Sequence, residues 1–179
     1  YYEPPFRFLS YTTFAAECIY TSFNEHLTKN YSRSLSIDSA LAKVEFENNG
    51  TIYQREYFAS YPDSVIVCRF SANQKEKQNL EFFYRSNPQS KVEVQQINDN
   101  QVLFLGRLKD NDMQFSLRLQ IETKGGMVKI GKDGRIKVKG SDEVVLLLAG
   151  DTDYFMNFMP DFSDCNTYVG INPIETTKK

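Results

Sequence analysis

Tryptophan is absent from this 179-residue chain, and histidine occurs only once, as His26. A catalytic triad or a multi-histidine metal site therefore cannot be built from this chain alone. The net charge is only -2, without a long block of like charges that would attract a polyanion. The longest apolar run, residues 144–150, is far shorter than the ~20 residues that cross a bilayer, and no signal peptide is visible at the start. We expect neither nucleic acid nor a membrane as a partner.

Cysteine is also scarce, with Cys18, Cys68 and Cys165 as the three examples. An odd number argues against a framework of disulfide bonds, and Cys68 lies in an apolar segment where a thiol behaves as a small hydrophobe. The alternative of a single disulfide bond between two of the three cysteines is left open. No pattern in the chain calls for a cofactor, and we assign none.

What the chain does contain is short segments that alternate apolar and polar residues with a period of two. Clusters rich in Asn, Asp, Gly and Pro stand between these segments and are typical of hairpin turns. Helical patterns are almost absent apart from a turn near residues 36–41 and a start near Asn172 and Pro173. The pattern predicts an all-β fold, a large antiparallel β-sandwich with few or no helices.

Residues 51–71 read as two strands joined by a tight turn at Pro62 and Asp63. The second strand, residues 65–70, is too continuously apolar for a half-exposed edge, so we expect it in the middle of a sheet. The most apolar strands supply the predicted core residues, which are Phe58, Val65, Val67, Phe70, Leu146 and Leu148.

Residues 151–164, named here the acidic aromatic loop, follow the most hydrophobic strand of the chain. Carboxylates beside rings suit either a neighbouring domain or a sugar, because rings stack on pyranose faces while acids accept hydroxyl hydrogen bonds. A calcium ion wants six to eight oxygens, but the loop lacks EF-hand spacing, and we assign no metal. The interdomain or glycan-contact candidates are Asp151, Asp153, Tyr154, Phe155, Phe158 and Phe162. We expect at least one of the three phenylalanine rings to lack a full packing partner.

A basic segment, residues 124–139, carries six Lys and Arg residues. Arg135, Lys137 and Lys139 alternate with Ile136 and Val138, so the charges share one wet face of a hairpin. Because no aromatic residues are interleaved, a charged face that protects a sheet edge explains the segment better than nucleic-acid binding.

Three blocks of sequence carry a resemblance to a known family. They are Tyr31-x-Arg33-x-Leu35-x-Ile37-Asp38-x-Ala40, the Arg-Glu-x-Phe-Ala-Ser-Tyr-Pro-Asp-x-Val-Ile-Val stretch of residues 55–67, and Val144-x-Leu146-Leu147-Leu148-Ala149-Gly150-x-Thr152-x-Tyr154. In this order, from about residue 11 to residue 173, the chain resembles the N-terminal domain of glycoside hydrolase family 95, which contains inverting α-L-fucosidases.

The resemblance implies a β-sandwich at residues 1–172 that lacks the family's first strands, and a linker toward a helical barrel starting at residues 173–179. It also implies that the catalytic groups belong to that barrel, so we assign no catalytic residue here, and that the parent protein is periplasmic or secreted. The expected partners are the barrel of the same polypeptide and a fucosylated glycan. A self-standing carbohydrate-binding sandwich and an orphan interaction domain stay open as alternatives.

Overall fold

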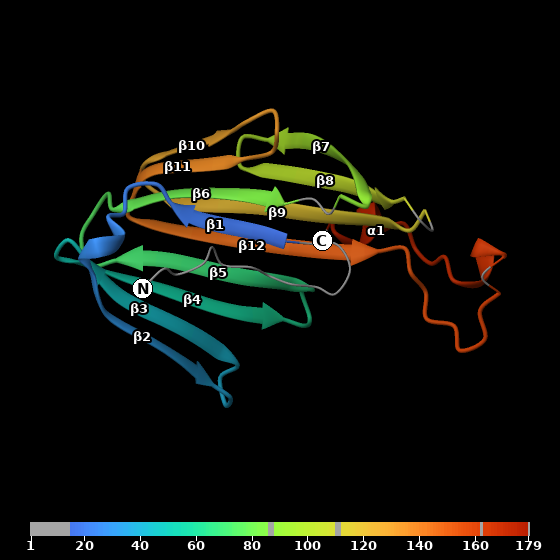
Figure 1. Ribbon diagram of the computed structural model, residues 1–179, viewed down its shortest axis with the longest axis horizontal. Coiled ribbons are helices and arrows are strands. Elements are labelled where there is room, and N and C mark those ends of the chain that lie inside the picture. The colour runs from blue at the N-terminus through green and yellow to red at the C-terminus, as the bar shows by residue number, and fades with distance from the viewer. Residues whose placement is uncertain (1–14, 86–87, 110–111, 162, 179) are drawn as a thin grey trace.

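The computed structural model of this protein describes residues 15–85, 88–109, 112–161 and 163–178. Two antiparallel sheets pack face to face (Figure 1). The larger sheet has eight strands in the order β2-β3-β4-β5-β12-β9-β8-β7, and the smaller has four in the order β1-β6-β11-β10. The predicted all-β sandwich is therefore confirmed.

The strands have the following bounds. The larger sheet contains β2 (Thr28–Ser36), β3 (Leu41–Asn48), β4 (Thr51–Ser60), β5 (Val65–Ala72), β7 (Ser90–Asn98), β8 (Gln101–Leu108), β9 (Gln114–Lys124) and β12 (Glu143–Thr152). The smaller sheet contains β1 (Ala15–Tyr20), β6 (Gln78–Arg85), β10 (Met127–Ile130) and β11 (Ile136–Ser141). Two 3-10 turns, η1 (Glu25–Leu27) and η2 (Cys165–Thr167), and one short α-helix, α1 (Pro173–Thr176), complete the described elements.

The turn residues explain several of the connections. Asn49 and Gly50 join β3 to β4 with φ values of 49° and 74°. Positive φ at both central residues is what a two-residue hairpin of the primed type requires, and Asn-Gly adopts it at low cost. The segment near residues 36–41, which we expected to be helical, is instead the turn between β2 and β3.

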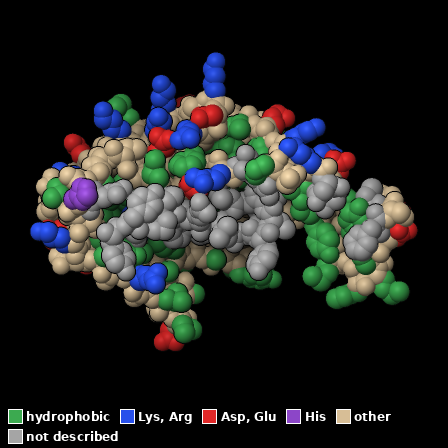
Figure 2. Space-filling view, in the orientation of Figure 1, with side chains coloured by type: hydrophobic (Ala, Val, Ile, Leu, Met, Phe, Trp, Pro, Cys, Tyr) green, Lys and Arg blue, Asp and Glu red, His purple; other side chains and the backbone are tan. Residues whose placement is uncertain are grey.

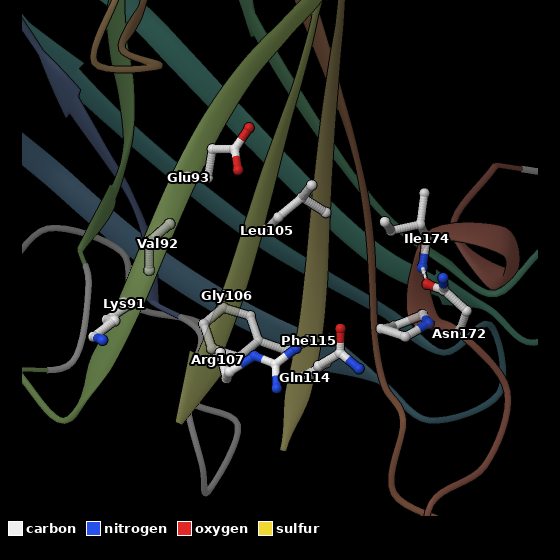
Figure 3. Close-up of a pocket in the computed structure, with 11 residues that line it drawn as sticks. Lys91, Val92, Glu93, Leu105, Gly106, Arg107, Gln114, Phe115, Asn172 and Ile174 are labelled. Carbon is white, nitrogen blue, oxygen red and sulfur yellow. Dashed lines mark hydrogen bonds between the residues drawn. The ribbon is translucent and has the colours of Figure 1, made fainter. Parts of the chain in front are cut away.

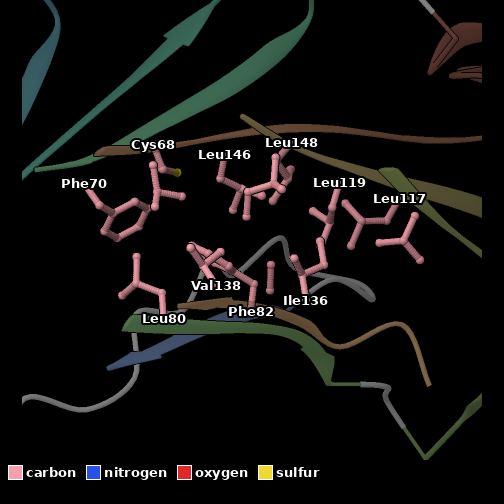
Figure 4. Packing of buried hydrophobic residues seen from close by; sticks show 14 of the residues in the cluster. Cys68, Phe70, Leu80, Phe82, Leu117, Leu119, Ile136, Val138, Leu146 and Leu148 are labelled. Atoms are coloured by element: carbon pink, nitrogen blue, oxygen red, sulfur yellow. The ribbon is translucent and has the colours of Figure 1, made fainter. Parts of the chain in front are cut away.

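The core lies between the two sheets, where side chains from both inner faces interlock (Figure 4). Cys68 and Phe70 on β5 face Leu80 and Phe82 on β6 across this layer. The rings of Phe70 and Phe82 meet edge to face with centroids 5.4 Å apart. The alternation read from the sequence thus assigns the inner face correctly for most strands.

Three of the six predicted core residues lie on the other face of the larger sheet. Phe70, Leu146 and Leu148 are buried in the core, as predicted. Phe58 is 42% exposed, and Val65 and Val67 are only half-buried. Their predicted orientation was wrong because their strand neighbours Tyr57, Ile66 and Cys68 take the inward positions, and strand residues alternate between faces.

The end of the described chain packs back on the larger sheet. Asn172 caps α1, since its side chain accepts a hydrogen bond from the backbone N–H of Ile174, so the predicted helix start is confirmed. Ser116 of β9 donates a 2.7 Å hydrogen bond to the carbonyl oxygen of Pro173 and lies 2.9 Å from the hydroxyl of Thr177. In the part of the chain that the structure describes, no helix is long and apolar enough to span a membrane.

Candidate functional site

The acidic aromatic loop projects from the sandwich beyond the end of β12 (Figure 1). Phe155 is 61% exposed and Phe158 is 91% exposed. Tyr154, Met156 and Met159 are exposed beside them, and Figure 2 shows hydrophobic side chains gathered on this lobe. The expected unpacked ring is confirmed, whereas Phe162 lies outside the described residues. Such a contiguous apolar surface is typical of an interaction site.

The loop is held by hydrogen bonds to residues 167–169, which include the end of η2. The backbone N–H of Phe155 donates to the carbonyl oxygen of Tyr168 at 2.7 Å. The side-chain amide of Asn157 donates to the carbonyl oxygen of Thr167 at 2.9 Å. Tyr154 also forms a bridge with Val169. The exposed rings therefore stand on an ordered scaffold, which lowers the entropic cost of docking them against a partner.

The four aspartates of the loop bond to different groups, and Asp151 lies within β12. Asp153 is buried and accepts hydrogen bonds from the backbone N–H of Gln114 at 2.9 Å and from its side-chain amide at 3.2 Å. Asp161 accepts from the hydroxyl and the backbone N–H of Ser163, and these bonds lower the pKa of Asp161. Asp151 and Asp164 accept local bonds of the same kind. The described residues contain no cluster of acidic, His or Cys side chains suited to a metal ion.

A second apolar surface crosses the outer face of the larger sheet. Val67 on β5 pairs with Phe58 on β4 and with Leu147 on β12. These three side chains, named here the outer apolar row, point away from the core, because the alternate residues of their strands fill it. The sequence analysis predicted a central strand here, and β5 does lie inside the sheet, but it placed Val67 in the core instead of on this surface.

Charged side chains form a chain of ion pairs beside the outer apolar row. Glu56 contacts Lys43 at 3.0 Å and Arg69 at 2.8 Å, and Arg69 contacts Glu143 at 2.6 Å. Hydrogen bonds from these cations lower the pKa of both carboxyl groups, and the bonds to Glu143 and Glu56 raise the pKa of Arg69. The row is thus bordered by polar groups, as the apolar core of an interface is.

A groove of about 420 Å³ opens where β7, β8 and β9 meet the segment that leads into α1 (Figure 3). Its lining residues are Lys91, Val92, Glu93, Leu105, Gly106, Arg107, Gln114, Phe115, Asn172, Pro173 and Ile174. This volume lies within the range of roughly 300–1,000 Å³ that small-ligand pockets span. The groove could not be found from the sequence, because no motif links its four separate segments.

The lone histidine and the basic segment lie elsewhere on the sandwich. His26 is exposed in η1. On β11, Lys137 and Lys139 are exposed while Ile136 and Val138 are buried, so the expected wet face is confirmed. The expectation that these charges protect a sheet edge was wrong, because β11 lies between β6 and β10. Lys137 instead contacts Glu81 at 3.4 Å, and Arg135 contacts the same carboxylate.

Comparison with known proteins gives one family for most of the chain. Residues 4–157 match the family described as "Glycosyl hydrolase family 65, N-terminal domain". A solved structure, described as "Putative kojibiose phosphorylase from human microbiome", superposes with a TM-score of 0.53. The match covers 77% of this chain and 22% of that chain, and at 8% sequence identity it supports the fold alone.

Two curated proteins are similar in sequence. "Alpha-L-fucosidase 2" of Arabidopsis thaliana is 26% identical over 156 residues, which cover 75% of this chain and 18% of that protein. "Probable alpha-fucosidase A" of Aspergillus niger is 29% identical over 128 residues, which cover 69% of this chain and 16% of that protein. The chain therefore spans less than a fifth of the length of either relative.

Proposed function

Because the chain belongs to the family of glycosyl hydrolase family 65 N-terminal domains, we propose that it is the non-catalytic N-terminal domain of an α-L-fucosidase-like glycoside hydrolase of family 95. The proposal depends on one observation: the chain is similar to two proteins named as fucosidases, and the matches cover only 18% and 16% of the length of those proteins. An inverting glycosidase needs two carboxyl groups about 6.5–9.5 Å apart across the sugar, and we place that pair in the remaining, helical part of the polypeptide.

The role of the domain in this proposal is to pack on the catalytic barrel and border its cleft. Its contacts are the outer apolar row and the exposed rings of the acidic aromatic loop, since both expose apolar area that a neighbour would bury. In this proposal the linker toward that neighbour starts at residues 173–179. We place the parent protein in the periplasm or outside the cell, where fucosylated glycans are available.

Activity measurements test the assignment. The protein encoded by the complete reading frame should hydrolyse an aryl α-L-fucoside, and residues 1–179 alone should not, because binding without a positioned acid and base supplies little rate. Turnover by residues 1–179 alone that disappears when one carboxylate is changed would overturn the proposal. A reading frame without a helical region after Lys179 would do the same.

Docking is tested with a matched pair of variants. Phe158→Ser should lower the melting temperature of the complete protein. It should leave the melting temperature of the isolated residues 1–179 unchanged, because the ring is 91% exposed in this domain. The control is Ile37→Ser at the turn between β2 and β3, where an 87% exposed apolar side chain is lost away from the loop. Equal effects of the two variants on the complete protein would contradict docking through the loop.

The exposure of Phe155 and Phe158 also favours a second candidate, a carbohydrate-binding module that grips a glycan with these rings. The two candidates differ in what residues 1–179 do alone. A module binds an oligosaccharide through the loop without the barrel, and Phe158→Ser abolishes that binding. A docking domain shows no such binding at the loop.

A further inference from the structure

The groove between β7, β8, β9 and α1 carries polar groups whose orientation is already fixed. The side-chain amide of Gln114 donates through Nε2 to Asp153 at 3.2 Å, which leaves its oxygen, Oε1, as the acceptor end. Asn172 is oriented in the opposite sense. Its Oδ1 accepts from the N–H of Ile174 at 3.0 Å, which leaves its Nδ2 as the donor end. One acceptor and one donor therefore stand preorganised at the groove.

Charged side chains add both kinds of group. Arg107 and Lys91 are exposed donors on neighbouring positions of β8 and β7, and Figure 3 shows Arg107 beside Gln114. Arg107 has one exposed ion pair, to Asp112 at 3.7 Å, and a guanidinium carries further N–H groups. Glu93 accepts from Gln95 at one oxygen, and a carboxylate can accept several bonds. The lining thus offers donors and acceptors in comparable number.

Apolar groups complete the lining. Leu105 and Glu93 pair across β8 and β7, and Ile174 stands on the opposite wall in Figure 3. Aliphatic side chains between hydrogen-bonding groups match a ligand that presents C–H faces edged by hydroxyl groups. Glu93 would repel an anion such as phosphate while Arg107 and Lys91 would attract it, so phosphate is the competing ligand. A purely apolar ligand would cover the polar groups without forming hydrogen bonds to them.

We propose that this groove is a saccharide-binding site of the domain, in which Glu93, Arg107, Gln114 and Asn172 bind sugar hydroxyl groups over Leu105 and Ile174. Each hydroxyl donates one hydrogen bond and accepts others, which is the mixture that the lining supplies. The site is separate from the exposed rings of the acidic aromatic loop, and its occupant is an oligosaccharide held by a non-catalytic domain.

The test is a nuclear magnetic resonance titration of residues 1–179 with three probes: 2′-fucosyllactose, a xyloglucan oligosaccharide and maltotriose. At least one probe should give saturable shifts of the backbone amide signals of Gly106, Gln114 and Ile174. Glu93→Gln should weaken this binding by about tenfold, because a charged hydrogen-bond acceptor is lost. Arg107→Ala should weaken it similarly, and the control Lys139→Ala, at an exposed position of β11, should not.

Inorganic phosphate is the counter-probe. For a saccharide, Glu93→Gln weakens binding, whereas for an anion the same change strengthens binding, because a negative charge is removed. Phosphate shifts at these amides that grow stronger in Glu93→Gln would overturn the proposal. So would the lack of saturable shifts with all three oligosaccharides, shifts confined to residues 154–158, or unchanged affinity in both groove variants. These outcomes do not depend on whether the complete protein hydrolyses fucosides.

Discussion

Phe58 and Phe70 lie on adjacent strands but on opposite faces of the larger sheet, and replacing each with alanine tests that orientation. Phe70 is 2% exposed and meets Phe82 at 5.4 Å and Tyr57 at 6.3 Å between ring centroids. Losing a buried phenylalanine costs ~3–5 kcal/mol, which includes the cavity left behind. Phe58 is 42% exposed, so Phe58→Ala forfeits about half of the ~1.5–3 kcal/mol of full burial, or roughly 1–1.5 kcal/mol.

Urea unfolding of residues 1–179, followed by circular dichroism, measures both values. We expect Phe70→Ala to lower the free energy of unfolding by at least about 1.5 kcal/mol more than Phe58→Ala, with an unchanged dependence on urea concentration. A domain is stable by only ~5–15 kcal/mol, so Phe70→Ala should also lower the soluble yield. Equal losses for the two variants would refute the assignment of Phe58 to the outer face.

Three further predictions follow from other contacts. Gly106→Ala should destabilise the domain by about 1–3 kcal/mol in the same urea assay, because a Cβ at this position would lie 1.8 Å from the ring of Phe115; a neutral result would contradict this packing. The pKa values of Glu56 and Glu143 are lowered from 4.5, so their ion pairs stabilise the fold at pH values above 4.5, and this stabilisation is lost as the pH falls through the lowered pKa values. Arg69→Met should therefore weaken the dependence of the melting temperature on pH in the acid range; an unchanged dependence would argue against the ion pairs. Burial raises the pKa of the half-buried Cys18 to about 12 and that of the buried Cys68 further, so iodoacetamide at neutral pH should label both thiols slowly in the folded protein, as peptide mass spectrometry would show; rapid labelling of Cys68 would contradict its burial.

The sequence predicts the strands well because period-two alternation and turn chemistry act locally. Leu117, Leu119 and Ile121 alternate with polar residues, and all three face the core. The Asn172-Pro173 pair predicts the start of α1 for a similar reason, since a capping side chain and a fixed φ act within one turn.

The orientation of β5 was predicted wrongly although the strand carries a signal for it. Val65 and Val67 share one face with Arg69 and Ser71, whereas Ile66, Cys68 and Phe70 form a wholly apolar set. The charge of Arg69 favours the first set on the outer face, but the two valines make the start of the strand apolar on both faces. The smaller sheet covers the face that carries Cys68 and Phe70.

The groove was unpredictable for another reason. Its walls come from residues 91–93, 105–107, 114–115 and 172–174, which strand pairing and the return of the chain bring together. No spacing within one segment indicates such a site. By contrast, the exposed rings of the acidic aromatic loop were predicted from their sequence position after the most apolar strand, and their role stays a prediction.

The position of β12 has a consequence for synthesis of the protein. It lies between β5 and β9, yet it is the last strand in the described part of the chain. Until residues 143–152 leave the ribosome, β5 and β9 each present an open edge, and the two halves of the larger sheet are not joined. Such long-range pairing favours slow folding, and the unpaired edges of β5 and β9 can pair with strands of other nascent chains. The domain therefore depends on its final strand for closure, and chains that end before Glu143 should be prone to aggregate.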